Sequence, residues 1–199
     1  MQHRANLKLK SNNMNDYCNG IVYATGYVAN DADKKYLVIR NLDSWYPEQI
    51  SNESGYKVYK SIHNYGRDGK PQYVVKARNI NSVPNLESIV SHSDFCRAYI
   101  EIHGVIDMGT TIDRKGNKFT KPRLRIYGSE DVISFINDVL PAKRKKLQYI
   151  SNQVENRYIG KTCAIYYQSK NEIEDILNWI NGSQRNEHVW SKWNKIISI

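Results

Sequence analysis

The feature that most constrains this chain is a segment with the character of a helix that occurs twice. The stretches "YCNGIVYATG", residues 17–26, and "FCRAYIEIHG", residues 95–104, each begin with an aromatic residue and a cysteine and end on a glycine. Apolar residues fill most of the space between, and a closing glycine is typical of a helix end. A duplicated helix predicts that the 199-residue chain is built from two similar halves.

The second half divides into a regular series of elements. The spacing of apolar residues, turn residues and prolines predicts the following order: a helix over 93–104 capped by Ser93 or Asp94, a hairpin over 105–129 with its turn at 113–116, an amphipathic helix over 129–141, a basic strand over 142–153, a return strand over 160–170 and a helix over 171–182.

The first half predicts the same order. Its elements are a helix ending at Gly26, strands around 28–41, a short helix over 44–50, a hairpin over 56–79 with its turn at 66–69, and a last helix over 82–90. We therefore expect an α+β protein of two tandem α-β-β-α-β-β-α repeats. The expected organisation is a basic tail over 1–14, a first repeat over 15–91, a second repeat over 92–182 and a C-terminal helix over 183–199.

Net charge indicates the class of partner, and the spacing of the cysteines indicates the redox environment. The chain carries 29 Lys and Arg against 20 Asp and Glu, a formal charge of +9, which favours a polyanion such as nucleic acid. The three cysteines lie far apart without a CxxC pair, so buried thiols in a reducing cytoplasm are expected rather than a zinc site or disulfides. No stretch is long and apolar enough for a membrane span, and no secretion signal is visible.

The layout resembles the LAGLIDADG homing endonuclease family in its single-chain, two-repeat form. The nine-residue family signature matches residues 18–26 and 96–104. The resemblance implies a pseudo-two-fold arrangement in which the two signature helices pack together and antiparallel sheets form a DNA-binding saddle. Small residues at the repeat interface would let the helices approach; the residues concerned are Gly20, Ala24, Ala98 and the bulkier Ile102.

The residue before each closing glycine departs from the family pattern. The resemblance places a metal-binding Asp or Glu there, and this chain has Thr25 and His103 instead. Neither is an anionic oxygen ligand of the kind that Mg²⁺ requires. We therefore expect no catalytic residue, no bound metal and no cofactor, with Mg²⁺ needed only if the chain is an active endonuclease.

Basic residues on the predicted strands are the candidate nucleic-acid contacts. Arg123 and Arg125 are two apart and share one face of a strand, opposite Leu124 and Ile126, which makes them the expected guanine readers. The full candidate set is Lys35, Arg40, Lys57, Lys60, Lys76, Arg78, Lys118, Lys121, Arg123, Arg125, Lys143, Arg144, Lys145 and Lys146.

The sequence thus favours a sequence-specific double-stranded DNA-binding protein without cleavage activity, acting as a monomeric regulator or blocker at its site. It would be cytoplasmic and associated with the nucleoid through DNA. Three alternatives stay open at this point. They are a divergent metal-dependent endonuclease, an RNA-binding splicing cofactor like the maturases of the family, and an adaptor for an acidic protein partner. A saddle of paired strands suits B-form DNA better than the narrow major groove of A-form RNA.

Overall fold

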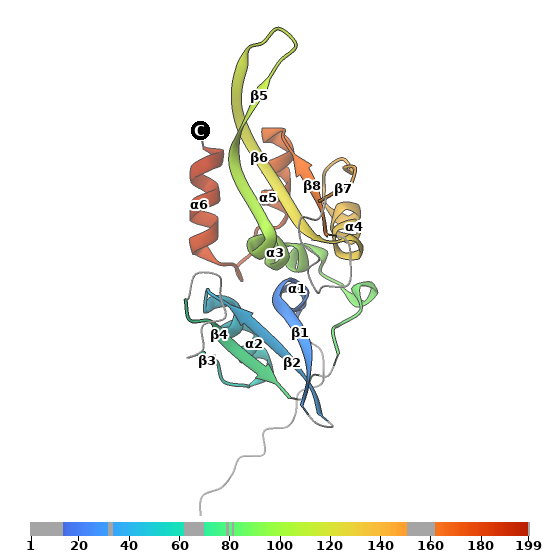
Figure 1. Cartoon of the computed structure of the whole chain (residues 1–199), viewed down its shortest axis with the longest axis vertical. Coiled ribbons are helices and arrows are strands. Elements are labelled where there is room, and N and C mark those ends of the chain that lie inside the picture. Colours follow the sequence, from blue (N-terminus) through green and yellow to red (C-terminus); the bar gives the residue numbers. More distant parts are fainter. Residues whose placement is uncertain are drawn as a thin grey trace, which may run out of the picture.

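The computed structural model describes residues 14–31, 34–61, 70–78, 80, 82–150 and 162–198. These residues form two α+β units, one above the other, and helices α1 (Asp16–Thr25) and α3 (His92–His103) lie side by side between them (Figure 1). The predicted two-repeat α+β fold is confirmed. The predicted basic tail, apart from Met14, and the predicted turn at 66–69 lie outside the described residues.

The first unit is a four-stranded antiparallel sheet with α1 and α2 on one face. Its strands lie in the order β1-β2-β4-β3. After α1 come β1 (Gly26–Asp31), β2 (Lys34–Asn41), α2 (Trp45–Ser54), β3 (Tyr59–Lys60) and β4 (Tyr73–Ala77). The helix expected over 82–90 is a single 3-10 turn, Leu86–Ser88. The Asn85 side chain accepts the Glu87 N–H at its start, and the chain is extended again by Ile89, which leaves no room for a longer helix.

The second unit repeats this sheet with the strand order β5-β6-β8-β7. After α3 come β5 (Gly104–Ile112), β6 (Lys118–Ser129), α4 (Glu130–Val139), β7 (Gln148–Tyr149), β8 (Thr162–Tyr167), α5 (Lys170–Trp179) and α6 (Glu187–Ile197). The β5–β6 hairpin turns through Gly116, whose φ of 84° favours glycine. This hairpin projects well beyond the rest of its sheet (Figure 1).

The basic strand expected over 142–153 is mostly absent from the part of that range that the structure describes. Gln148 and Tyr149 pair with β8, and the Ile150 N–H donates to the Thr162 carbonyl at 3.1 Å. Upstream of them, the Asn137 side chain on α4 donates to the carbonyl of Lys145 at 2.8 Å and accepts its N–H at 2.9 Å. These bonds satisfy the Lys145 backbone without a neighbouring strand, so the segment after α4 follows the helix instead of joining the sheet.

The two repeats meet where α1 crosses α3. A Cβ atom on Gly20 would lie 2.4 Å from the carbonyl oxygen of Phe95 and 2.9 Å from the Cβ atom of Ala98. Only a residue without a side chain permits this approach. Ala98 is buried in the core of the first unit, while Ala24 of the first unit packs against the core of the second. The two cores are thereby joined through these helices.

A buried carboxylate fastens α6 to this crossing. Glu101 on α3 accepts the Tyr17 hydroxyl of α1 at 2.6 Å, the Trp190 Nε1–H of α6 at 2.7 Å and the Asn186 N–H at 3.2 Å. Burial raises the pKa of the Glu101 carboxyl above its usual range, and these hydrogen bonds act against that rise. Glu101 therefore links both repeats to the C-terminal helix.

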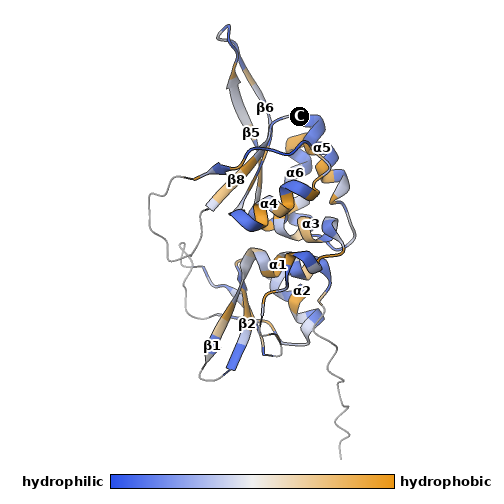
Figure 2. Cartoon of the chain, turned by 90° about the vertical axis from the view of Figure 1, so that its right-hand side faces the viewer, coloured by the Kyte–Doolittle hydropathy of each residue, from blue (hydrophilic) through white to orange (hydrophobic). Residues whose placement is uncertain are grey.

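Helices and sheets form separate sides of the molecule. In the side view, both sheets lie on one side and the helices on the other (Figure 2). The helix-facing side of each sheet is buried and apolar, as Leu37 and Ile39 in the first unit and Leu124 and Ile126 in the second show. None of the helices in the described ranges has the length and apolar character needed to cross a membrane.

Candidate nucleic-acid interface

The ends of α1 and α3 carry the two side chains that stand where the resemblance implies metal-binding acids. The Thr25 hydroxyl donates to the Ile21 carbonyl at 3.3 Å, a bond commonly made by hydroxyls within helices. His103 bonds across the repeat interface, from Nε2 to the Ala24 carbonyl at 2.7 Å. Because a carbonyl only accepts, Nε2 carries the proton and is not available as a metal ligand.

The acidic residues nearest to His103 in sequence are engaged elsewhere. Glu101 is turned into the core, as described above. Asp107, three residues after Gly104, is paired with two arginines. In the part of the chain that the structure describes, no group of three or more His, Cys, Asp or Glu residues is placed to hold a metal ion. The residues at the helix ends therefore do not fit the divalent metals that the family resemblance implies.

The face of the first sheet that points away from the helices carries cations stacked with aromatic rings. Because side chains alternate along a strand, residues 36, 38 and 40 lie on the face opposite Leu37 and Ile39, although Val38 is itself buried. On this face the Arg40 guanidinium lies 5.8 Å from the centre of the Tyr27 ring, and Lys76 Nζ lies 5.8 Å from the centre of the Tyr36 ring. We call this surface, together with its counterpart on the second sheet, the open face.

The second sheet presents a denser set of cations on its open face. Lys121, Arg123 and Arg125 alternate along β6 with the buried Pro122 and Leu124. Arg125 donates from Nη1 to the Tyr127 hydroxyl at 3.0 Å and lies over that ring. The predicted shared face of Arg123 and Arg125 is thus present in the structure.

The two arginines are held by a carboxylate on the neighbouring strand. Asp107 pairs directly with Arg123 in the β5–β6 register. Arg123 donates to it twice, from Nε to Oδ1 at 3.0 Å and from Nη2 to Oδ2 at 3.1 Å, and Arg125 donates from Nη2 to Oδ2. Hydrogen bonding from Arg123 is the main reason that the pKa of Asp107 lies below its usual range, so this carboxylate is ionised at neutral pH.

An open hollow borders this cluster near the end of β8. Lys121 and Tyr166 contribute to its wall from the sheet, and Ser169 and Glu172 from the start of α5. Lys145 also lines it and is paired with Glu172 at 2.6 Å. Glutamine side chains complete the lining through Gln148 and Gln168. The hollow thus combines amide, hydroxyl and ammonium groups, which can bond to bases or phosphates, with one carboxylate, Glu172, which is paired with Lys145.

The predicted cations fall into three groups by position. Those on the open face are Arg40, Lys76, Lys121, Arg123 and Arg125. Those whose strand positions place them on the opposite face are Lys35, Lys60 and Lys118, although all three are exposed at the margins of the sheets. Those outside strands are Lys57, Arg78, Lys143, Arg144, Lys145 and Lys146. Their contact with nucleic acid stays a prediction.

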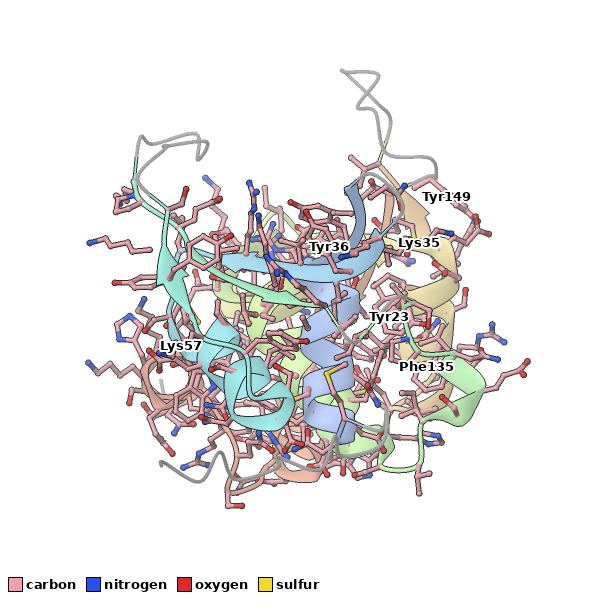
Figure 3. All side chains as sticks on the ribbon, turned by 90° about the horizontal axis from the view of Figure 1, so that it is seen from below. Tyr23, Lys35, Tyr36, Lys57, Phe135 and Tyr149 are labelled. Atoms are coloured by element: carbon pink, nitrogen blue, oxygen red, sulfur yellow. The ribbon has the colours of Figure 1, made fainter. Side chains whose placement is uncertain are left out.

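Pleating separates neighbours that the sequence places together. Lys35 and Tyr36 both lie on the sheet side of α1 when the molecule is seen from below, but they belong to opposite faces of β2 (Figure 3).

Lys57 and the basic segment 143–146 lie outside the strands. Lys57 lies in the connection between α2 and β3, on the opposite side of the molecule from Phe135 in the view from below (Figure 3). The segment 143–146 follows α4, where Arg144 is paired with Asp138 at 3.0 Å.

Sequence reasoning missed the aromatic and acidic members of the open face. Tyr27, directly after the closing Gly26, is 44% exposed, and its ring lies beneath the Arg40 guanidinium. Tyr36 and Tyr166 lie on the same face of their sheets. The alternation of tyrosine with buried residues along these strands was the available signal. For Asp107 the signal was its place opposite Arg123, which requires the hairpin register.

Comparison with known proteins gives no sequence relative but clear structural ones. No family model and no curated protein matches the sequence. The LAGLIDADG homing endonuclease I-LtrWI bound to target DNA is 12% identical, with a TM-score of 0.58 over 92% of this chain and 90% of that chain. I-SmaMI bound to uncleaveable DNA is 10% identical, with a TM-score of 0.60 over 93% and 89%. I-SmaMI bound to uncleaved DNA with calcium ions is 8% identical, with a TM-score of 0.59 over 94% and 92%. At these identities the likeness shows a shared fold.

Proposed function

We propose that this chain binds double-stranded DNA sequence-specifically along the open face of its two sheets and does not cleave it. The carrying observation is the position of the cations: by strand register, Arg40 and Lys76 on one sheet and Lys121, Arg123 and Arg125 on the other lie on the face opposite the helix-packed core residues. Both sheets lie on the same side of the molecule (Figure 2). Cations attract the phosphate backbone, and arginines on strands can read guanine in the major groove.

The structural neighbours support this choice of partner. I-LtrWI and I-SmaMI are described in complex with DNA, and the match covers about nine tenths of this chain. A shared fold does not by itself transfer an activity, so the proposal rests on the cations of this chain and takes the neighbours as support. One chain supplies both sheets, which is why we propose a monomer.

The side chains at the ends of α1 and α3 support the proposal that the chain does not cleave DNA. In-line phosphodiester hydrolysis assisted by metals needs anionic oxygen ligands close to the scissile phosphate. Thr25 and His103 offer a hydroxyl and an imidazole, and both groups are already bonded to backbone carbonyls. A protein that recognises a site but leaves it intact acts by occupying it. Regulation of transcription, or blocking of another DNA-processing reaction, is therefore the role we propose.

Selection from a random duplex DNA library at near-physiological salt tests the proposal. The bound fraction is sequenced, and the same pool is examined for strand breaks with Mg²⁺ and with Mn²⁺. We expect an enriched motif in uncut DNA. Strand breaks at an enriched motif would show an active endonuclease instead, and enrichment only from a single-stranded RNA library would favour the splicing-cofactor alternative.

Charge reversal locates the binding surface in the same experiment. Two separate variants, Lys76→Glu and Lys121→Glu, each reverse one charge on the open face. A third variant, Lys192→Glu, reverses one charge on the exposed side of α6. We expect the first two variants to lose at least tenfold in affinity for the selected duplex, since each also places a carboxylate near phosphate. Equal losses in all three variants would contradict binding at the open face.

A further inference from the structure

The geometry of the Asp107 cluster leaves one edge of Arg123 available. A guanidinium has five N–H donors arranged along two forked edges. The bonds from Nε and Nη2 to Asp107 occupy the side edge. The end edge, formed by Nη1 and the second N–H of Nη2, is the fork that matches the two acceptors of guanine, O6 and N7. Asp107 therefore fixes the direction in which Arg123 presents its free donors.

Gly109 makes room for this arrangement. It lies on the same face as Asp107, and a Cβ atom there would be 3.3 Å from Arg123 Nε and 3.4 Å from its Cζ. That contact is tighter than ordinary van der Waals separation, so a Cβ atom at position 109 would shift the guanidinium by a few tenths of an ångström, and a bulkier side chain would shift it further. The backbone next to the cluster thus accommodates Arg123 in the orientation that Asp107 selects.

The same carboxylate changes the electrostatics of the open face. Arg123 and Arg125 together would carry two positive charges, and Asp107 offsets one of them. Phosphate attraction depends on net charge and is independent of sequence, whereas a fixed donor fork discriminates between bases. A carboxylate in this position therefore weakens general attraction and favours discrimination.

Resting on the proposed DNA-binding function, we propose that Asp107 is a specificity-determining residue that positions Arg123 to read guanine, with Arg125 held beside it by the same carboxylate. Its carboxylate touches the two arginines and acts through them. The fork that results reads one or two adjacent base pairs in the half of the target that lies on the second sheet.

Comparison of Asp107→Asn with Asp175→Asn tests this role. Asp175 is exposed on α5, so both changes add one positive charge but only the first removes the bidentate acceptor. Affinity for the selected duplex and for a scrambled duplex is measured over a series of salt concentrations. We expect the ratio of the two affinities to fall about tenfold in Asp107→Asn, as for loss of one base-reading pair, and to change less than twofold in Asp175→Asn.

Repeating the library selection with Asp107→Asn gives a readout that a general structural defect would not produce. The guanine preference should disappear at one or two adjacent positions while the rest of the motif is retained. Gly109→Val tests the positioning without a change of charge, and we expect it to lower discrimination with an unchanged salt dependence.

Two kinds of outcome would contradict the proposed role of Asp107. If Asp107→Asn keeps the wild-type motif and an affinity ratio within twofold, or if Asp175→Asn loses as much discrimination, Asp107 has no such role. If the wild-type protein selects no duplex at all, the proposed function has failed and this inference falls with it. Unfolding midpoints of the variants, followed by circular dichroism, separate loss of discrimination from loss of fold.

Discussion

Thr25 and His103 occupy the positions just before Gly26 and Gly104, and each bonds to a backbone carbonyl near the seam between the repeats. At the same seam the carboxylate of Glu101 is enclosed by Tyr17 and Trp190. At the residue scale, then, the imidazole and carboxylate groups of this region hold helices together, and the Thr25 hydroxyl bonds within its own helix.

Glu101 should make stability depend on pH in a definite direction. Because burial raises its pKa in the folded protein, the folded state binds more protons than the unfolded chain between the two pKa values. The contribution of this group is greatest below its unfolded pKa of about 4.3 and is lost as pH rises through the folded pKa. Glu101→Gln removes the titration.

Urea unfolding at pH 4 and pH 7 measures this effect. The free energy of unfolding of the wild-type protein, minus that of Glu101→Gln, should be larger at pH 4 than at pH 7. Subtracting the variant removes the contributions of other carboxylates, such as Asp107, whose lowered pKa has the opposite effect. A difference that grows between pH 4 and pH 7 would contradict the assigned direction.

At the scale of elements, the contact between α1 and α3 decides whether the repeats stay together. Gly20→Ala places a Cβ atom 2.4 Å from the Phe95 carbonyl, which forces the helix backbones apart. Overpacking of this kind typically lowers the free energy of unfolding by about 1–3 kcal/mol. The better helix propensity of alanine, about 1 kcal/mol, offsets part of that loss.

The clash is with backbone and so belongs at the upper end of the overpacking range, and chemical denaturation of Gly20→Ala should therefore show a net loss of about 2 kcal/mol. Ser191→Ala on the exposed side of α6 is the matched control for an alanine placed in a helix, and it should be close to neutral. Unchanged or increased stability of Gly20→Ala would contradict the close approach of the two helices.

Elements with a strong local signal could be predicted from the sequence. The helix that became α4 has apolar residues at helical spacing and ends just before Pro141, and the β5–β6 hairpin has the turn glycine Gly116. The strand predicted to include residues 142–147 was wrong there, because the basic and apolar residues of this segment are also typical of an exposed strand. There the Asn137 side chain binds the Lys145 backbone, a tertiary contact with no local sign.

The candidate site was predictable in its chemistry but only partly in its geometry. Arg123 and Arg125 could be placed on one face because strand side chains alternate. Lys35, Lys60 and Lys118 could not be assigned to a face without knowing which neighbours enter the core, and the pleat puts them opposite the open face. Asp107 required the register between β5 and β6, which the sequence alone does not supply.

At the scale of the whole molecule, two sheets on one side and helices on the other leave an extended surface of strands without a helical cover (Figure 2). The chain carries a formal charge of +9, and both sheets direct cations to this surface. Duplex DNA is a long polyanion that can contact both sheets at once. We therefore propose that duplex DNA lies on the open face.

Lysine modification with an amine-reactive reagent, read by mass spectrometry with and without the selected duplex, tests that claim most directly. Lys76 and Lys121 on the open face should lose reactivity when the duplex is bound, while Lys192 and Lys195 on the exposed side of α6 should react as before. A duplex that protects Lys192 and Lys195 but leaves Lys76 and Lys121 reactive would contradict the account.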